Sequence, residues 1–341
     1  MKYTINEQPN SKIEIKIELD KNDLLPFKEK ALKDFSLKIK VDGYRQGKAP
    51  LEIVESKIPP LELSEKTASL AIEEIYPKII LQEKINAIGY PEVNISKLVP
   101  NQEIEFKVIV SVLKEIILPD YKSIAKEENK NKKTEVTVSD KEIEDTLNWI
   151  YLTRNKNVNP EDKNSFKIDD EFAKSLGNFS SLEDLKKNIK EGIKIEKEQK
   201  ELEKWRINLL EKIMEKIEWD LPEILIHSEI HKMIDELKIK LEEMQLPFEE
   251  YLKQIKKTEE DLEKDLRETA EKRVKISLIL REIAIKENIN ASSEEIEERA
   301  NRIISQIYDE ELKAKIDPVE LRNFVSTLIQ NEKVFSFLEN Q

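Results

Sequence analysis

The stretch GYRQGKAP, residues 43–50, holds the side chains best suited to binding a charged partner. Glycine is scarce in this chain, with five in 341 residues, yet two of the five stand here, at Gly43 and Gly47. An arginine offers a planar fork of donors for phosphate or carboxylate, and a tyrosine ring stacks on a base or fills an apolar groove. The stretch therefore predicts an exposed contact loop made of Gly43, Tyr44, Arg45, Gln46, Gly47 and Lys48. The alternative is a plain turn between two helices, in which glycine supplies a positive φ and Pro50 begins the next helix.

Motifs for catalysis and for nucleotide binding fit this chain poorly. A phosphate-binding loop needs G-x-x-x-x-G-K-[ST] after a strand. Here the two glycines are one residue too close, Ala49 replaces the hydroxyl residue, and a helix is expected before them. No G-x-S-x-G motif occurs, and abundant carboxylates are typical of solvated helix faces. We therefore expect no catalytic residue, no nucleotide and no other cofactor.

The only two histidines, His227 and His231, lie four residues apart in HSEIH. That spacing places both imidazoles on one face of a helix. A zinc protease motif needs glutamate directly after the first histidine, but Ser228 stands there. Two solvated or half-buried histidines are the simpler interpretation, so no metal site is predicted.

Composition favours a helical protein that is largely exposed to water. Charged residues make up 38% of the chain, and cysteine is absent, which excludes disulfides and thiolate metal sites. No apolar run has the length of a signal peptide or a membrane span, so we expect a cytoplasmic protein. The net charge of −13 is uneven, because residues 1–60 carry 12 Lys/Arg against 10 Asp/Glu, whereas residues 121–341 carry 40 against 51. An anionic partner therefore meets least repulsion at the N-terminal end.

The fold class predicted is α+β, with a compact N-terminal domain over residues 1–117. Alternating charged and apolar residues predict strands at 12–19 and 103–113. Helices are expected at 24–39, at 51–58 and at 64–85, the first capped by Asn22 or Asp23 and the last kinked at Pro77. Gly89, Pro91 and Pro100 are interpreted as turns.

The rest of the chain predicts helices. Residues 118–137 are polar and are interpreted as an extended linker, and residues 138–341 as a nearly all-helical domain. Capping residues mark helix starts at Ser139, Ser181, Thr258 and Ser292 or Ser293, and prolines do so at 222, 247 and 318. The three tryptophans, Trp149, Trp205 and Trp219, lie in or at the ends of these helices, and core packing is expected for most of them.

GYRQGKAP resembles the signature loop of the trigger factor family of bacterial ribosome-associated chaperones, which is close to G-F-R-x-G-K-x-P. The segments EKINAIGYPEV, EIEFKVIV, VTVSDKEIEDTLNWIYLTR and IDDEFAKSLGNFSSLEDLKKNIKEGI resemble other parts of that family in the same order. The resemblance covers essentially the whole chain. It implies that residues 1–117 bind the ribosome and that residues 138–341 form a helical substrate-binding domain with arms.

This chain departs from the family pattern in two ways. The family usually has Phe at the position of Tyr44 and commonly Lys at that of Gln46, so one positive charge is missing from the loop. In addition, the family carries an FKBP-like prolyl isomerase domain of roughly 100 residues, an ordinary domain size, before the DDEFAK segment. Only 13 residues separate Arg154 from Ile168 here, so no isomerase domain fits between residues 154 and 168.

The resemblance implies an ATP-independent chaperone that docks at the ribosomal exit tunnel and holds newly made, unfolded polypeptides. Its expected partners are the large ribosomal subunit and nascent chains, with no DNA and no membrane, and with a homodimer as a state away from the ribosome. Two alternatives stay open: a peptidyl-prolyl isomerase with a reduced site, and a helical adaptor that does not bind ribosomes.

Overall fold

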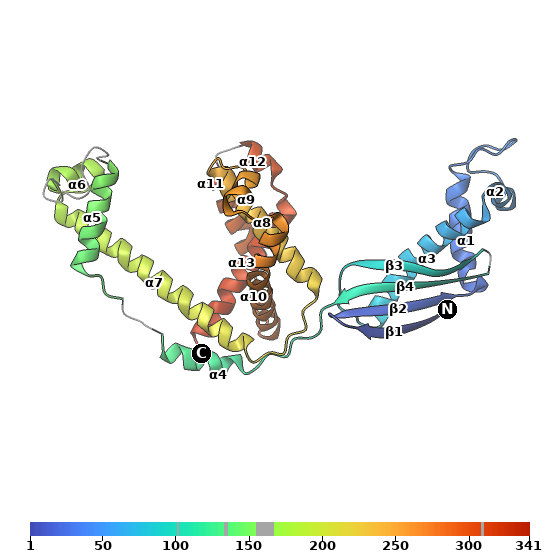
Figure 1. The fold of residues 1–341 in the computed structure, drawn as a ribbon, viewed down its shortest axis with the longest axis horizontal. Helices are drawn as coiled ribbons and strands as arrows, with labels where there is room; N and C mark the ends of the chain where they lie inside the picture. The colour runs from blue at the N-terminus through green and yellow to red at the C-terminus, as the bar shows by residue number, and fades with distance from the viewer. Residues whose placement is uncertain (101, 133–135, 155–166, 308–309) are drawn as a thin grey trace. The chain divides into compact units, whose positions relative to one another are not determined.

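The computed structural model describes residues 1–100, 102–132, 136–154, 167–307 and 310–341, and Figure 1 follows the chain from blue to red. Its internal contacts divide the chain into two compact units. The first unit comprises Met1–Ile117 and Glu218–Ser277, and the second comprises Leu118–Ile217 and Leu278–Gln341. The expected N-terminal domain, residues 1–117, forms one of the two stretches of the first unit. Residues 218–277, which the sequence assigned to the helical domain, group with it.

A four-stranded antiparallel sheet is the centre of the first unit, with strand order β1-β2-β4-β3. The predicted strands are confirmed as β2 (Lys12–Leu19) and β4 (Glu103–Val112), and they pair along their whole length. Alternate residues of both strands are buried because they face the same core as α3 (Pro60–Gln82). That core contains Ile15, Ile17, Leu19, Phe106, Val108 and Val110 from the strands, and Ala68, Ala71, Ile75 and Ile79 from α3.

The two edge strands, β1 (Lys2–Gln8) and β3 (Ala87–Val99), were not predicted. In β1 nearly every side chain is exposed, so the sequence lacks the alternation that indicates a half-buried strand. In β3 the interpretation of Gly89 and Pro91 as turns is wrong, because both lie in a strand whose register shifts between Ile88 and Glu92. An edge strand tolerates this, since proline needs no partner for its missing N–H and glycine accommodates the bulge.

Three helices complete the N-terminal part of the first unit: α1 (Lys21–Ser36), α2 (Leu51–Lys57) and α3. The predicted cap of α1 is corrected, because Asp20 takes that position rather than Asn22 or Asp23. The Asp20 carboxylate accepts from the backbone N–H groups of both residues, and Asp23 accepts from the Asp20 N–H in return. The helix also ends at Ser36, three residues before the expected end, and this leaves Leu37–Pro50 as the connection to α2.

The second segment of the first unit is helical. It contains α8 (Glu223–Glu243), α9 (Phe248–Ile255) and most of α10 (Glu259–Lys286), which pack around Ile226, Ile230, Ile234, Leu262 and Ala270. Asp220, just before α8, accepts a hydrogen bond from Ser11 Oγ at 2.5 Å and lies 2.8 Å from Lys114 Nζ. These contacts join the segment to the end of the sheet within the first unit.

The second unit consists of helices in its described residues. They are α4 (Tyr121–Lys130), α5 (Asp140–Arg154), α6 (Asp170–Leu176), α7 (Leu182–Met214), the end of α10 from residue 278, α11 (Ser293–Gln306), α12 (Glu310–Lys315) and α13 (Pro318–Glu339). One core joins α5, α6 and α7 through Ile143, Leu147, Ala173, Leu185 and Ile189, and another joins α11 to α13. The predicted fold class, an α+β part followed by a mostly helical part, is confirmed.

The prediction that residues 118–137 form an extended linker is wrong for the part described as α4. Tyr121, Ile124 and Ala125 are buried at helical spacing, and α4 packs against α7 and α13. The Tyr121 hydroxyl also donates to Glu287 Oε1 at 2.5 Å. The short apolar stripe is easily overlooked beside KEENKNKK, and packing against two longer helices is what makes so short a helix stable.

The pKa of Glu142 tests the start of α5, because the Glu142 carboxylate bonds to the capping residue Ser139. Its carboxylate contacts Lys197 Nζ of α7 at 2.6 Å and accepts from the Ser139 backbone N–H at 2.9 Å, and these interactions, the lysine first, lower the pKa of Glu142 to about 2. A lowered folded-state pKa gives stability that is present above the ordinary value near 4.5 and is lost as the pH falls towards 2. We therefore expect the side-chain carboxyl carbon to titrate near pH 2 by NMR, and at a higher pH in Lys197→Gln. Titration of the unmodified protein near pH 4.5 would contradict the contact.

Candidate functional site

Five of the six residues of the predicted contact loop are exposed. Gly43, Tyr44, Arg45, Gln46 and Lys48 are all exposed, and Gly47 is half-buried. The Tyr44 side chain is 45% exposed although it is large and apolar. All six residues lie in one loop, between α1 and α2, so the structure brings the predicted site residues together.

Hydrogen bonds hold this loop against the end of α1. The Gly47 N–H donates to the Ser36 carbonyl at 2.9 Å, and the Lys48 N–H donates to the Arg45 carbonyl at 2.9 Å. Gln46 Nε2 donates to the Leu37 carbonyl at 2.5 Å. The side chain of Gln46 therefore stabilises the loop, while those of Tyr44 and Arg45 are presented to solvent.

Below the loop, a small core fixes α1, α2 and the start of α3. Its buried residues are Ala31, Leu32, Val54, Ile58 and Leu63, with Ala49 and Leu51 packed against them. Because both ends of the loop are anchored in this core, the loop is presented by a rigid base, as is usual for binding loops.

Both glycines have a left-handed backbone, with φ of +84° at Gly43 and +79° at Gly47. A Cβ at Gly43 would meet nothing within 4 Å, whereas a Cβ at Gly47 would lie 2.8 Å from Leu37 Cδ2. Leu37 is exposed, so its side chain can move away. The positive φ is therefore the main reason for glycine at both positions, and it answers why a glycine-poor chain has two glycines here.

Gly43→Ala and Gly47→Ala are each expected to lower the free energy of unfolding by about 1–2 kcal/mol, the cost of a left-handed non-glycine residue. Gly47→Ala should in addition shift the methyl NMR signals of Leu37. A matched control is Gly192→Ala in α7, where φ is helical and nothing lies within 4 Å of the added Cβ. It should stabilise the protein by up to about 1 kcal/mol. Chemical denaturation that ranks all three alike would contradict this account.

The loop has a positive surface that extends beyond the predicted residues. Lys38 and Lys40 are exposed beside it, and the described residues offer no ion-pair partner to Lys38, Lys40, Arg45 or Lys48. Asp42 is the single acidic residue in the connection from Leu37 to Pro50. The sequence did not indicate the two additional lysines because they fall in or directly after the helix expected at 24–39, and α1 ends before them.

Arg45 stands out by its residue type. It is the first arginine in the chain, and the next is Arg154. The positive side chains before it in the chain are all lysines, and a guanidinium differs from them in offering a planar fork of directional donors.

The histidine pair lies on α8, as expected. His227 Nε2 is 3.4 Å from Glu223 Oε1, and the His227 side chain is exposed. In the parts of the chain that the structure describes, no group of three or more His, Cys, Asp or Glu side chains is placed to hold a metal ion.

The tryptophans differ from one another. Trp205 of α7 is buried, which confirms core packing for this residue, and Trp219 is half-buried with Lys275 Nζ 5.6 Å from its ring centroid. Trp149 is an exception to core packing, because its side chain is 67% exposed on α5. Helical spacing places Trp149 on the face opposite the buried residues Ile143, Leu147 and Tyr151.

Exposed apolar side chains continue on the other helices. In the second unit they are Ile195, Ile207, Ile285, Val319 and Phe324, and in the helical segment of the first unit Ile224, Ile239 and Met244. Each of these side chains offers a separate apolar contact on an otherwise charged helix surface. None of the described helices combines the length and the apolar character needed to cross a membrane.

Two family sequence models match this chain. The one described as bacterial trigger factor protein (TF) matches residues 1–150, and the one described as bacterial trigger factor protein (TF) C-terminus matches residues 181–339. Together they cover most of the 341 residues. Only 30 residues, 151–180, lie between them, which leaves no room for a further domain of about 100 residues.

Curated proteins named trigger factor match this chain over nearly their whole length. Trigger factor of Clostridium botulinum (strain Loch Maree / Type A3) is 25% identical over 410 residues, and the match covers 96% of this chain and 95% of the relative. Trigger factor of Clostridium kluyveri (strain NBRC 12016) is 25% identical over 412 residues with the same coverage. Because 410 aligned positions exceed the 341 residues of this chain, at least 69 positions of the first relative have no counterpart here.

A solved structure shares the fold. It comes from work entitled "Promiscuous Substrate Recognition in Folding and Assembly Activities of the Trigger Factor Chaperone", and it matches with a TM-score of 0.59 and 17% identity over 100% of both chains. The exposed loop, the sheet packed on α3, the helical remainder and both family models agree, and the chain therefore belongs to the bacterial trigger factor family.

Proposed function

We propose that this protein is an ATP-independent chaperone that docks on the large ribosomal subunit at the tunnel exit through residues 43–48. It then holds newly made, unfolded polypeptide on its helical surfaces. The observation that carries the proposal is the exposure of Tyr44 and Arg45 on a loop whose backbone is fixed by two left-handed glycines and by the Gln46 side chain.

Electrostatics support an anionic partner for the loop. The exposed cations Lys38, Lys40, Arg45 and Lys48 carry four positive charges against one negative charge at Asp42. Ribosomal RNA is anionic, and each phosphate contact adds a little under one unit to the salt dependence of binding. Two to four contacts predict a slope on the order of −1.5 to −3.5 in log K against log salt. A chaperone that cycles between ribosomes needs reversible binding, and few ionic contacts are compatible with that need.

The exposed apolar residues of the helices support the holding function. Trp149 on α5 and Phe324 on α13 are more than 60% exposed, and neither is needed by a described core. Several separate apolar patches bind one flexible chain more tightly than any patch alone, because each contact raises the effective concentration of the next. A chain held in this way is withdrawn from aggregation by mass action.

We further propose that release needs no nucleotide and that the protein has no prolyl isomerase activity. The sequence has no phosphate-binding loop, and the 30 residues between the two matched regions do not accommodate an isomerase domain. The proposed setting is the cytoplasm, with a homodimer as the state away from the ribosome.

Sedimentation of the intact protein with bacterial ribosomes tests the docking step, and delayed aggregation of a denatured client protein without ATP tests the holding step. Both should be positive, and proline isomerisation of a short peptide should proceed at its uncatalysed rate. A protein that neither pellets with ribosomes nor delays aggregation would instead be a helical adaptor. Isomerisation clearly above background would place it with the isomerases.

A further inference from the structure

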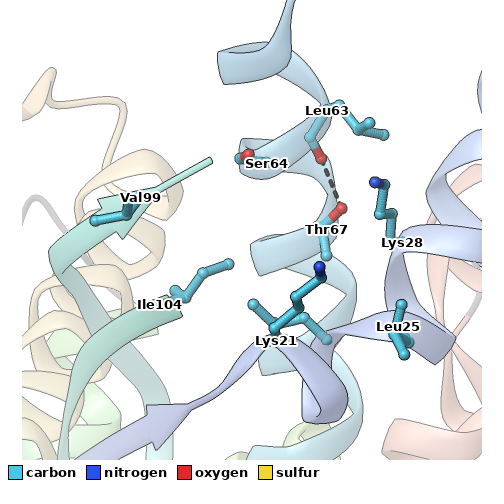
Figure 2. A pocket seen from close by; sticks show the side chains of 9 residues that line it. Lys21, Leu25, Lys28, Leu63, Ser64, Thr67, Val99 and Ile104 are labelled. Carbon is cyan, nitrogen blue, oxygen red and sulfur yellow. Dashed lines mark hydrogen bonds between the residues drawn. The ribbon is translucent and has the colours of Figure 1, made fainter. Parts of the chain in front are cut away.

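A small cavity in the N-terminal part of the first unit lies apart from the loop. It has a volume of about 40 Å³ and is formed by the start of α1, the start of α3 and the residues on either side of the β3–β4 connection. Its apolar lining is Leu24, Leu25, Leu63, Val99 and Ile104, and its polar lining is Lys21, Lys28, Ser64 and Thr67. Figure 2 shows these side chains gathered from the three parts of the fold.

Two lysines give the cavity its charge. In Figure 2 the side chains of Lys21 and Lys28 extend from α1 toward Thr67 and Leu63 on α3. Lys28 Nζ lies 2.6 Å from Glu55 Oε1 and is therefore partly neutralised. Lys21 is exposed, and no acidic side chain of the described residues pairs with it. No acidic residue lines the cavity itself.

The two hydroxyl groups are not available as donors. Ser64 Oγ donates to the Pro60 carbonyl at 2.8 Å, and Thr67 Oγ1 donates to the Leu63 carbonyl at 2.7 Å. Both bonds stay within α3, so the wall of the cavity offers methyl groups and hydroxyl oxygens. Among the nine described residues that line the cavity, the side-chain donors left are the lysine ammonium groups, which pair well with a carboxylate.

Size limits the apolar part of the occupant. A single water needs at least about 10–15 Å³ of such volume, so 40 Å³ accommodates about three water-sized groups. That is the branched end of one leucine or valine side chain. A long alkyl chain does not fit. Ile104 also lines a second depression, whose charged groups are of both signs: Asp23 pairs with the Met1 amino group and Glu103 with Lys97, so the described residues of this depression offer a carboxylate no unpaired cation comparable to Lys21 except Lys2.

We propose that this cavity binds a peptide in which a leucine-type side chain stands beside a carboxylate. The side chain enters between Leu24, Leu63 and Ile104, and the carboxylate pairs with Lys21. The carboxylate comes either from the C-terminus of a peptide ending in leucine or from an acidic residue directly after leucine. The site lies in the N-terminal part of the first unit and does not depend on the contact loop or on the proposed function.

Methyl NMR of the intact protein tests the site with three peptides. One ends in leucine with a free carboxylate, one is the same peptide amidated, and one carries Leu-Asp between blocked ends. At least one of the two carboxylate peptides should shift the methyl signals of Leu24, Val99 and Ile104 and bind up to about 5-fold more tightly than the amidated peptide, as expected for an exposed ion pair. Whichever binds identifies the source of the carboxylate.

Matched variants separate the two parts of the site. Lys21→Gln should remove the preference for a carboxylate, whereas Lys33→Gln, an exposed lysine of the same helix outside the cavity, should leave it unchanged. Leu25→Ser alters an exposed residue at the rim and should weaken all three peptides without unfolding the protein. Tyr44→Ala/Arg45→Ala should bind the peptides normally. A failure of peptide binding at the cavity can therefore be told apart from a failure of ribosome docking through the loop.

Three results would overturn the proposal. They are an amidated peptide that binds as tightly as both carboxylate peptides, cavity methyl signals that respond to none of them, and decanoate binding more tightly than any peptide.

Discussion

Tyr44→Ala/Arg45→Ala is expected to bind ribosomes at least about 10-fold more weakly than the unmodified protein, while its circular dichroism spectrum and melting temperature stay the same. Tyrosine and arginine are the residue types that most often dominate a binding interface, and both side chains are exposed here without a role in any described core. Sedimentation with ribosomes over a range of protein concentrations measures the loss.

The double variant is more informative than a triple variant that also removes Gln46. Gln46 donates to the Leu37 carbonyl, so Gln46→Ala would loosen the loop as well as alter its surface. Tyr90→Ala is a suitable control, because Tyr90 on β3 is 98% exposed and lies outside the loop. Arg45→Lys should recover only part of the affinity, since lysine keeps the charge but not the planar fork of donors.

The docking assignment is wrong if the double variant pellets with ribosomes as well as the unmodified protein does. It is also wrong if Tyr90→Ala weakens binding equally, because the loss would then follow from removing any exposed tyrosine.

A fragment ending at Ile117 is expected to keep ribosome binding within about 3-fold and to lose the suppression of aggregation completely. The core that joins the sheet to α3 draws its buried residues from Ile13 to Val112, so the fragment retains a closed core. It also retains the loop and the small core beneath it. It lacks every helix that exposes Trp149, Ile195, Phe324 and the other apolar residues of the helical surfaces.

The end point of the fragment matters. Ending the chain at residue 137 would keep α4 but remove α7 and α13, and this would uncover Tyr121, Ile124 and Ala125. Newly exposed apolar residues could bind a client by themselves and imitate chaperone activity. Ending at Ile117 leaves α4 out of the fragment altogether.

The full-length double variant is the reciprocal control for the fragment. It should fail to bind ribosomes and still delay the aggregation of a denatured client. If the fragment suppresses aggregation as well as the whole protein does, the client-binding surface lies within the first 117 residues and the proposed role of the helices is wrong.

Local patterns in the sequence determined much of this protein. The helix starts at Ser139, Ser181, Thr258 and Ser292 were predictable because a cap is a hydrogen bond between residues three apart. The strands β2 and β4 were predictable because burial on one face imposes an alternation of two. The loop was predictable because its glycines, arginine and tyrosine stand within six residues. Its resemblance to the signature of a known family pointed to the same residues.

Tertiary structure decided what depends on residues far apart in the chain. The strands β1 and β3 exist because β2 and β4 offer them partners, and α4 exists because α7 and α13 cover its apolar side. The exposure of Trp149 follows from which face of α5 packs on α6 and α7. The cavity beside Lys21 combines residues from three separate segments between positions 21 and 104. Sequence patterns depend on residues that are neighbours along the chain, whereas burial depends on which surfaces pack together. The edge strands, α4, the exposure of Trp149 and the cavity are therefore set by contacts between distant segments.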